Sequence, residues 1–154
     1  AREGHSIRPE LLSLLGQLDR AVEKVAALAK DAPDDLRARL KNRLEKLEGA
    51  GLQPPASDDS RFHQEVALLI DRGDIREEIT RLSAHLKVYR ELIDPPPSKD
   101  QPKPIGKTLD FYAQELLREV NTVGSKSQTA ELTRLVVEAK TLVEKIREQV
   151  QNVE

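Results

Sequence analysis

The sequence predicts an all-α protein, with a helical hairpin over about residues 7–50 followed by a bundle of about three longer helices. Three observations support this prediction. The commonest residues are strong helix formers, namely Leu, Glu, Lys, Arg, Ala and Gln. Apolar residues recur at helical spacing in every long segment, and no alternation typical of β-strands is present. Proline, glycine and short polar clusters separate these segments.

The first predicted helix begins near Pro9, a residue type favoured in the first helical turn, and carries an apolar stripe from Leu11 to Ala29. The segment Asp31-Ala32-Pro33-Asp34-Asp35 combines a capping residue, an early proline and acidic residues, so it predicts the start of a second helix. Gly49-Ala50-Gly51 is expected to end that helix. Residues 1–56 are therefore predicted to form an antiparallel hairpin as a separate unit.

Residues 57–154 are predicted to form the second unit. Its first helical stretch starts near Ser57 and is interrupted at Gly73, where Asp74 and Glu77 favour a kink or a restart. Residues 94–106 hold five prolines and are expected to form a loop or linker. Two further helices are predicted, over about residues 107–123 and from about residue 128 to the C-terminus.

Composition excludes several classes of function. The chain has no cysteine, so disulfides, thiolate zinc sites and cysteine nucleophiles are excluded. No apolar run approaches the roughly 18 residues needed to span a bilayer, so we expect no membrane partner and a cytoplasmic location. A net charge of -2 and only four aromatic residues argue against a strongly basic or base-stacking RNA-binding surface. The chain lacks methionine and starts at Ala1, so we expect a piece of a longer protein.

Three polar stretches stand out from ordinary solvated charge. In the first, Asp74, Glu78, Arg81 and His85 lie at i, i+4, i+7 and i+11, on one helical face. A carboxylate, a guanidinium and an imidazole in one row can bind a metal or a phosphate and transfer protons. Ion pairing within the helix, with an incidental histidine, explains the same spacing.

The second stretch places Glu115, Arg118, Glu119 and Thr122 on one face. Carboxylates at i and i+4 can together hold a hard divalent cation. Arg118 can bind a phosphate or simply neutralise its neighbours. Spacing alone favours the explanation that these side chains have a structural role only, without binding a metal or a phosphate. Glu144 and Glu148 form another acidic pair of the same spacing near the C-terminus.

The third stretch is Gly124-Ser125-Lys126-Ser127, at a predicted helix N-terminus. Free backbone N–H groups, hydroxyls and a lysine make an anion site there. A P-loop is excluded, because its preceding glycine and strand are absent and a serine separates Gly124 from Lys126. A well-capped turn is the alternative explanation.

Taken together, these stretches resemble the C-terminal region of the YicC family of bacterial proteins, across about residues 60–154. The hairpin is similar to that family only in general character. The motifs that carry the resemblance are Gln64 to Leu69, Asp71 to Glu78, Arg81 to His85, Gly106 to Phe111, Gln114-Glu115, Arg118 to Thr122, Gly124 to Ser127, and Glu144 to Glu154.

The resemblance implies the C-terminal domain of a divalent-metal-dependent endoribonuclease that cleaves RNA phosphodiester bonds and forms ring-like homo-oligomers, expected to be hexamers. It also implies a further N-terminal domain, absent here. The implied catalytic residues are His85, Glu115 and Glu119, and the implied ligands for Mg²⁺ or Mn²⁺ are Glu78, Glu115, Glu119 and Glu148. The implied RNA- and phosphate-binding residues are Arg81, Arg118, Asn121, Ser125 and Lys126.

A non-catalytic reading of the same residues remains open. In it, the chain is a helical structural and oligomerisation module, and the polar motifs form an ion-pair network that holds helices together. The narrow leucine stripe of the predicted hairpin favours this alternative, because an exposed apolar edge calls for a partner.

Overall fold

The computed structural model describes residues 2–51, 59–97 and 106–152, and every regular element among them is an α-helix. In chain order the helices are α1 (Arg2–Gly49), α2 (Asp59–Arg72), α3 (Arg76–Ile93), α4 (Gly106–Lys126) and α5 (Ala130–Gln151). The all-α prediction is confirmed. No helix in the described ranges is long and apolar enough to cross a membrane. The predicted unit boundary between residues 56 and 57 and most of the predicted proline-rich linker lie outside the described residues.

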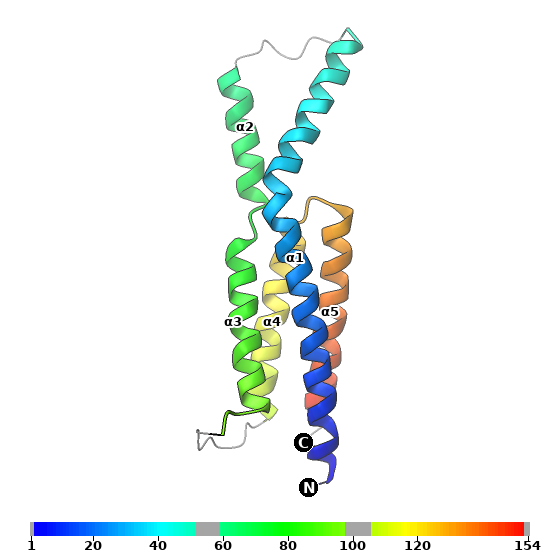
Figure 1. Ribbon diagram of the computed structural model, residues 1–154, viewed down its shortest axis with the longest axis vertical. Helices are drawn as coiled ribbons and strands as arrows, with labels where there is room; N and C mark the ends of the chain where they lie inside the picture. Colours follow the sequence, from blue (N-terminus) through cyan, green and yellow to red (C-terminus); the bar gives the residue numbers. More distant parts are fainter. Residues whose placement is uncertain (1, 52–58, 98–105, 153–154) are drawn as a thin grey trace.

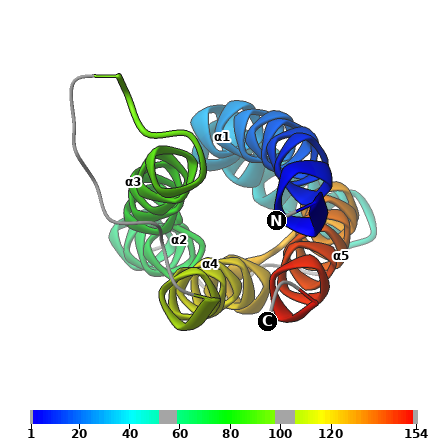
Figure 2. The same cartoon turned by 90° about the horizontal axis from the view of Figure 1, so that it is seen from below.

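Four helices form a bundle in which the order around the axis is α1, α3, α4, α5 (Figure 2). α1 ascends, α2 and α3 together descend, α4 ascends and α5 descends, so neighbouring helices are antiparallel (Figure 1). The core consists of the apolar stripes of the four helices, including Leu15 and Leu18 of α1, Tyr89 of α3, Leu116 of α4 and Ile146 of α5. Each of these side chains is fully buried, as expected where amphipathic helices bury their apolar stripes against one another.

The turn predicted at residues 31–35 is wrong, because α1 continues through Pro33 as a single helix of 48 residues. The sequence has no glycine between Gly16 and Gly49, so it lacks the residue that most often reverses a chain at a helix end. Proline removes one backbone hydrogen bond but leaves the bonds on either side in place. The first part of α1 is anchored by its buried stripe, and the rest projects beyond the bundle.

The projecting part of α1, residues 30–49, and α2 form what we call the arm. α2 runs beside α1 near the bundle, and the two helices diverge toward the far end (Figure 1). Leu36, Leu40 and Leu44 are only half-buried there, and Leu47 is exposed. The helical hairpin therefore exists, but it pairs the end of α1 with α2.

The expected interruption at Gly73 is confirmed as a restart, since α2 ends at Arg72 and α3 begins at Arg76. The break expected between the last two helices, at residues 124–127, is confirmed, but α4 continues past the predicted end at residue 123 to Lys126. A Cβ on Gly124 would lie 3.0 Å from Cγ1 of Val136, so this glycine permits the close approach of α4 and α5.

Candidate functional site

Four charged side chains meet in the seam between α3 and α4, and we call them the charge cluster: Glu78, Arg81, Glu119 and Lys126. Nε of Arg81 donates to Oε1 of Glu119 at 3.0 Å, across 38 residues of sequence. Nζ of Lys126 donates to Oε1 of Glu78 at 2.7 Å. Nη2 of Arg81 lies 3.7 Å from the same Glu78 oxygen, so the four side chains form one network.

The two carboxylates of this cluster are the buried charged groups of the described residues, with Glu78 2% and Glu119 6% exposed. Carboxylates are rarely buried unless a cation and hydrogen bonds compensate for the lost hydration, and each has its own cation here. Oε2 of Glu78 is buried and has no hydrogen-bond partner within the described part of the chain. The Glu119 hydrogen bond raises the pKa of Arg81 above its ordinary value, and the charge of Glu119 adds to this effect.

At the start of α3, Asp74 and Arg76 bond to each other. The backbone N–H of Arg76 donates to Oδ1 of Asp74 at 3.1 Å, and Nη2 of Arg76 lies 2.7 Å from Oδ2. The side-chain hydrogen bond from Arg76, with the backbone bond, holds the pKa of Asp74 below its ordinary value. The backbone carbonyl of Asp74 accepts from Nζ of Lys126 at 3.2 Å. The Asp74 carboxylate therefore does not join the other residues of the predicted polar face, because Arg76 binds it at the start of α3.

His85 extends the seam beyond the cluster, one helical turn past Arg81. It is half-buried, and its ring lies 6.3 Å from the ring of Tyr112 on α4. Glu115, also half-buried, is one turn from Tyr112 and one turn from Glu119. Sequence reasoning assigned no role to Tyr112, although its spacing of i-3 from Glu115 places it on the same face.

The predicted catalytic residues His85, Glu115 and Glu119 thus lie along one seam, but the four predicted metal ligands do not come together. Glu148 is exposed on α5, which lies beside α4 and α1 rather than α3. Within the described residues no three or more His, Asp or Glu side chains form a group that could hold a metal ion.

The donor set of the charge cluster itself does not fit a divalent cation. The guanidinium of Arg81 already lies 3.0 Å from Glu119 and 3.7 Å from Glu78, and Lys126 occupies the other side of Glu78. A second cation between these carboxylates would meet strong repulsion. Each carboxylate of the cluster already has a cation, while Oε2 of Glu78 keeps no hydrogen-bond partner within the described residues.

The predicted phosphate-binding residues separate onto two faces of α4. Arg81 and Lys126 belong to the charge cluster, whereas Arg118, Asn121 and Ser125 line a shallow hollow of about 580 Å³ on the outer side of α4. Arg147 of α5 also lines this hollow, and its Nε lies 3.3 Å from Oδ1 of Asp110. Three outward-facing polar side chains at i, i+3 and i+7, next to an arginine, can contact the backbone of a nucleic acid.

The helix N-terminus predicted at Gly124-Ser125-Lys126-Ser127 is wrong. These residues end α4, and α5 begins at Ala130 with Thr129 as its cap, whose side chain accepts from the N–H of Leu132. The hydroxyl of Ser125 donates to the carbonyl of Thr122 at 2.8 Å. The stretch therefore contributes side chains rather than a helix-terminal anion site.

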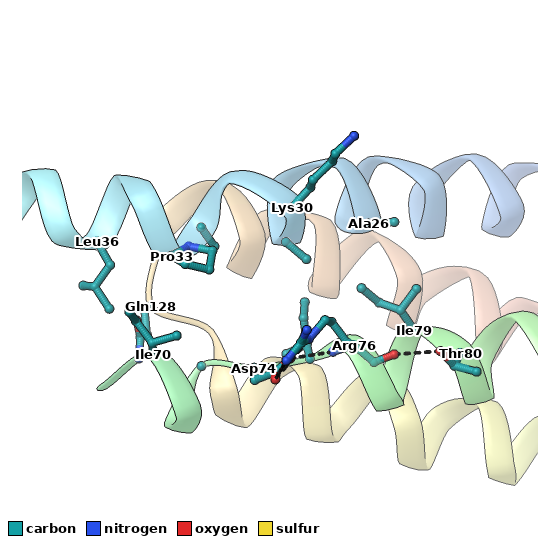
Figure 3. A pocket seen from close by; sticks show the side chains of 14 residues that line it. Ala26, Lys30, Pro33, Leu36, Ile70, Asp74, Arg76, Ile79, Thr80 and Gln128 are labelled. Atoms are coloured by element: carbon teal, nitrogen blue, oxygen red, sulfur yellow. Dashed lines mark hydrogen bonds and ion pairs between the residues drawn. The ribbon is translucent and has the colours of Figure 1, made fainter. Parts of the chain in front are cut away.

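A separate pocket of about 560 Å³ lies where α1 leaves the bundle, opposite the junction of α2 and α3 (Figure 3). Its walls are mainly apolar, formed by side chains such as Pro33 and Leu36 of α1 and Ile79 of α3. Asp74 and Arg76 bond to each other at its floor. Its lining contains none of the four charge-cluster residues, so the polar chemistry lies elsewhere.

A family described as "Endoribonuclease YicC-like, C-terminal" matches residues 25–154. A "Probable endoribonuclease YicC" from Clostridioides difficile (strain 630) is 36% identical over 154 residues, which cover 100% of this chain and 50% of that protein. A protein of the same description from Haemophilus influenzae (strain ATCC 51907 / DSM 11121 / KW20 / Rd) is 35% identical over 153 residues, covering 99% of this chain and 49% of that protein. The chain spans about half the length of these curated relatives.

Proposed function

This chain belongs to the YicC-like endoribonuclease family, and on that basis we propose that it is the C-terminal domain of an enzyme that cleaves phosphodiester bonds in RNA. The observation that best supports a site within this domain is the α3–α4 seam. It places His85 one turn from Arg81, a guanidinium that Glu119 fixes at 3.0 Å while the Arg81 side chain stays 48% exposed. A fixed but accessible cation beside a proton-transfer group suits phosphoryl chemistry.

The proposed roles follow from these contacts. Arg81 binds a phosphate and stabilises the negative charge that develops on its oxygens during cleavage. Cleavage needs one group to take the proton of the attacking oxygen and another to give a proton to the leaving oxygen, and His85 and Glu115 are the two groups proposed. Glu119 and Glu78 are positioning residues that hold Arg81 and Lys126. Arg118, Asn121 and Ser125 contact the RNA backbone farther along.

A requirement for Mg²⁺ or Mn²⁺ is a separate proposal, and no step above depends on it. Each carboxylate of the charge cluster is already paired with a cation, so we assign no metal to Glu78 or Glu119 as the structure arranges them. Cleavage compared in Mg²⁺, in Mn²⁺ and in chelator tests the requirement directly. Full activity in chelator would end this proposal.

The test of the main proposal is cleavage of a labelled single-stranded RNA by this chain and by the full-length protein. We expect His85→Ala to lower the cleavage rate by about 10²–10⁴-fold, the usual contribution of general acid–base catalysis. The matched control is His63→Ala, since His63 is an exposed histidine on α2. Equal rates for the two variants would remove His85 from the mechanism.

A second function has its own support, because the charge cluster also joins α3 to α4 as a structural network would. In this proposal the chain is a homo-oligomerisation module, with a hexamer as the expected assembly, and the half-buried leucines of the arm contact a neighbouring copy. Light scattering of the chain at high concentration tests it. A monodisperse monomer would count against assembly through this domain.

A further inference from the structure

One segment of the arm is positively charged, although the whole chain has a net charge of -2. Residues 36–46 hold five basic residues and one acidic residue, Glu45, which gives this segment a charge of +4 within a chain of net charge -2. The local electrostatic potential, rather than the net charge of the whole chain, determines where a polyanion binds. The net charge of -2 therefore does not describe this surface.

Three residues of this segment form what we call the basic row: Arg39, Arg43 and Lys46. They lie at i, i+4 and i+7 on one face of α1 and span about 10 Å along the helix. Together with Leu36, Leu40 and Asn42 they line a hollow of about 430 Å³. No ion pair involves any of the three within the described residues, whereas Arg37 on the opposite face lies 3.8 Å from Asp34.

The basic row leads toward the charge cluster. Arg39 also lines a smaller cavity of about 100 Å³, together with Lys126 and Gln128. Two acidic residues, Asp35 and Glu131, share that lining. Lys126 is the residue that bonds Glu78, so this lining, with two cations and two carboxylates, connects the basic row to the α3–α4 seam.

We propose that the basic row binds the sugar–phosphate backbone of RNA and directs the strand toward the α3–α4 seam. This inference rests on the proposed function, which supplies RNA as the substrate. Guanidinium and ammonium groups without a protein partner are the usual contacts of phosphate oxygens, and Asn42 adds a neutral hydrogen-bonding group. The hollow has no aromatic side chain for base stacking, so the contact is independent of sequence.

The experiment measures binding of a fluorescent single-stranded RNA to the 154-residue chain by anisotropy, over a series of salt concentrations. The test variant is Arg39→Gln with Arg43→Gln, and the matched control is Arg37→Gln with Lys41→Gln. Both remove two positive charges from the same helical segment, at exposed positions, and glutamine keeps helix propensity. Losing two phosphate contacts should weaken binding by roughly 20-fold at 0.1 M salt and reduce the log–log salt slope by about 1.4.

We expect the test variant to show this loss and the control variant to show clearly less. Equal losses in both would overturn the row as a site, and so would failure of the unaltered chain to bind RNA at low salt. Light scattering on the same samples excludes a protein interface. A change of oligomeric state that accounts for the lost binding would also overturn the proposal.

The result separates this inference from the proposed function. The His85→Ala variant should bind RNA as the unaltered chain does. If the row governs binding but His85→Ala cleaves normally, the inference stands and the assignment of the seam fails. If the row variants bind and cleave normally while His85→Ala does not cleave, the seam stands and the inference fails.

Discussion

Arg81 on α3 and Glu119 on α4 are joined by a hydrogen bond of 3.0 Å in which the glutamate side chain is buried and the arginine side chain is half exposed. The carboxylate therefore fixes Nε of Arg81, while Nη1 and Nη2 lie 3.6 Å from Glu77 and 3.7 Å from Glu78 on a side chain that stays 48% exposed, so a bound phosphate would share Arg81 with these acidic neighbours. The usual arrangement of a helix surface, with both partners solvated, contributes little rigidity. Here the buried partner gives Arg81 one preferred direction, which a phosphate-binding arginine needs.

The first prediction concerns the burial of Glu78. Lys126→Met removes the 2.7 Å contact and leaves a buried carboxylate with only Arg81 at 3.7 Å. Breaking a buried pair from one side is costly, so we expect the free energy of unfolding to fall by about 3 kcal/mol. Urea denaturation monitored by circular dichroism measures it.

The double variant Glu78→Leu with Lys126→Met is the control for this prediction. Removing both charges leaves no buried carboxylate without its cation, so most of the lost stability should return. A double variant less stable than Lys126→Met alone would show that the pair contributes more than charge compensation.

A second prediction separates Glu115 from Glu119, which the sequence presents as an equivalent i, i+4 pair. Glu119→Gln removes the charge that anchors Arg81, so we expect lower stability together with weaker RNA cleavage. Glu115 is only half-buried and its nearest ion-pair contact is Arg118 at 4.0 Å, so Glu115→Gln should lower cleavage with unchanged stability. Urea denaturation and the cleavage assay on both variants provide the comparison. Loss of cleavage without any loss of stability in both variants would instead favour their shared role as metal ligands.

Much of the fold was predictable from the sequence because the apolar stripes are long. The last two helices were predicted at about residues 107–123 and from about residue 128, and they are observed at Gly106–Lys126 and Ala130–Gln151. The differences fall at Pro33, where no turn forms, and at Gly124, where α4 continues three residues past its predicted end. Anchoring of the first part of α1 in the bundle and close packing of Gly124 on Val136 decide these two cases, and both are tertiary effects.

The burial of the two cluster carboxylates has a sequence signal that a search for polar motifs overlooks. Glu119 lies three residues after Leu116 and four before Val123, so it continues the buried stripe of α4. Glu78 stands in the same relation to Ile75 and Leu82 on α3. The identity of their partners has no such signal, since the pairing of Arg81 with Glu119 depends on how α3 and α4 pack.

A third prediction concerns Tyr89, a fully buried residue whose hydroxyl has no hydrogen-bond partner within the described residues. Because that hydroxyl gains nothing from burial, Tyr89→Phe should leave the free energy of unfolding at pH 7 unchanged or raise it by up to about 1 kcal/mol. Urea denaturation measures this, and Tyr112→Phe is the control at the other, less buried tyrosine. A loss of more than about 1 kcal/mol in Tyr89→Phe would reveal a partner for the hydroxyl.

The same residue gives a pH prediction with a definite sign. Burial raises the pKa of Tyr89 above its ordinary value of 10.0, and the charge of Asp110 adds to this. The unfolded chain therefore ionises Tyr89 first, and stability that is present below pH 10.0 is lost as the pH rises through that value. The loss reaches up to about 1.4 kcal/mol per pH unit and should be absent in Tyr89→Phe. Equal alkaline slopes in the two proteins would contradict the burial of this group.

The last prediction tests whether α1 is continuous. In an unbroken helix, Pro33→Ala restores a backbone N–H that can donate to the carbonyl of Ala29, and it removes a residue that disfavours a helix interior by about 3 kcal/mol. Amide hydrogens of the arm should then exchange more slowly, by up to about 100-fold, while Pro9→Ala at the other proline of α1 should leave the arm unchanged. If residues 31–35 instead formed a turn, proline would favour that turn, and its removal would speed exchange in the arm. The direction of the change therefore distinguishes one continuous helix from a hairpin.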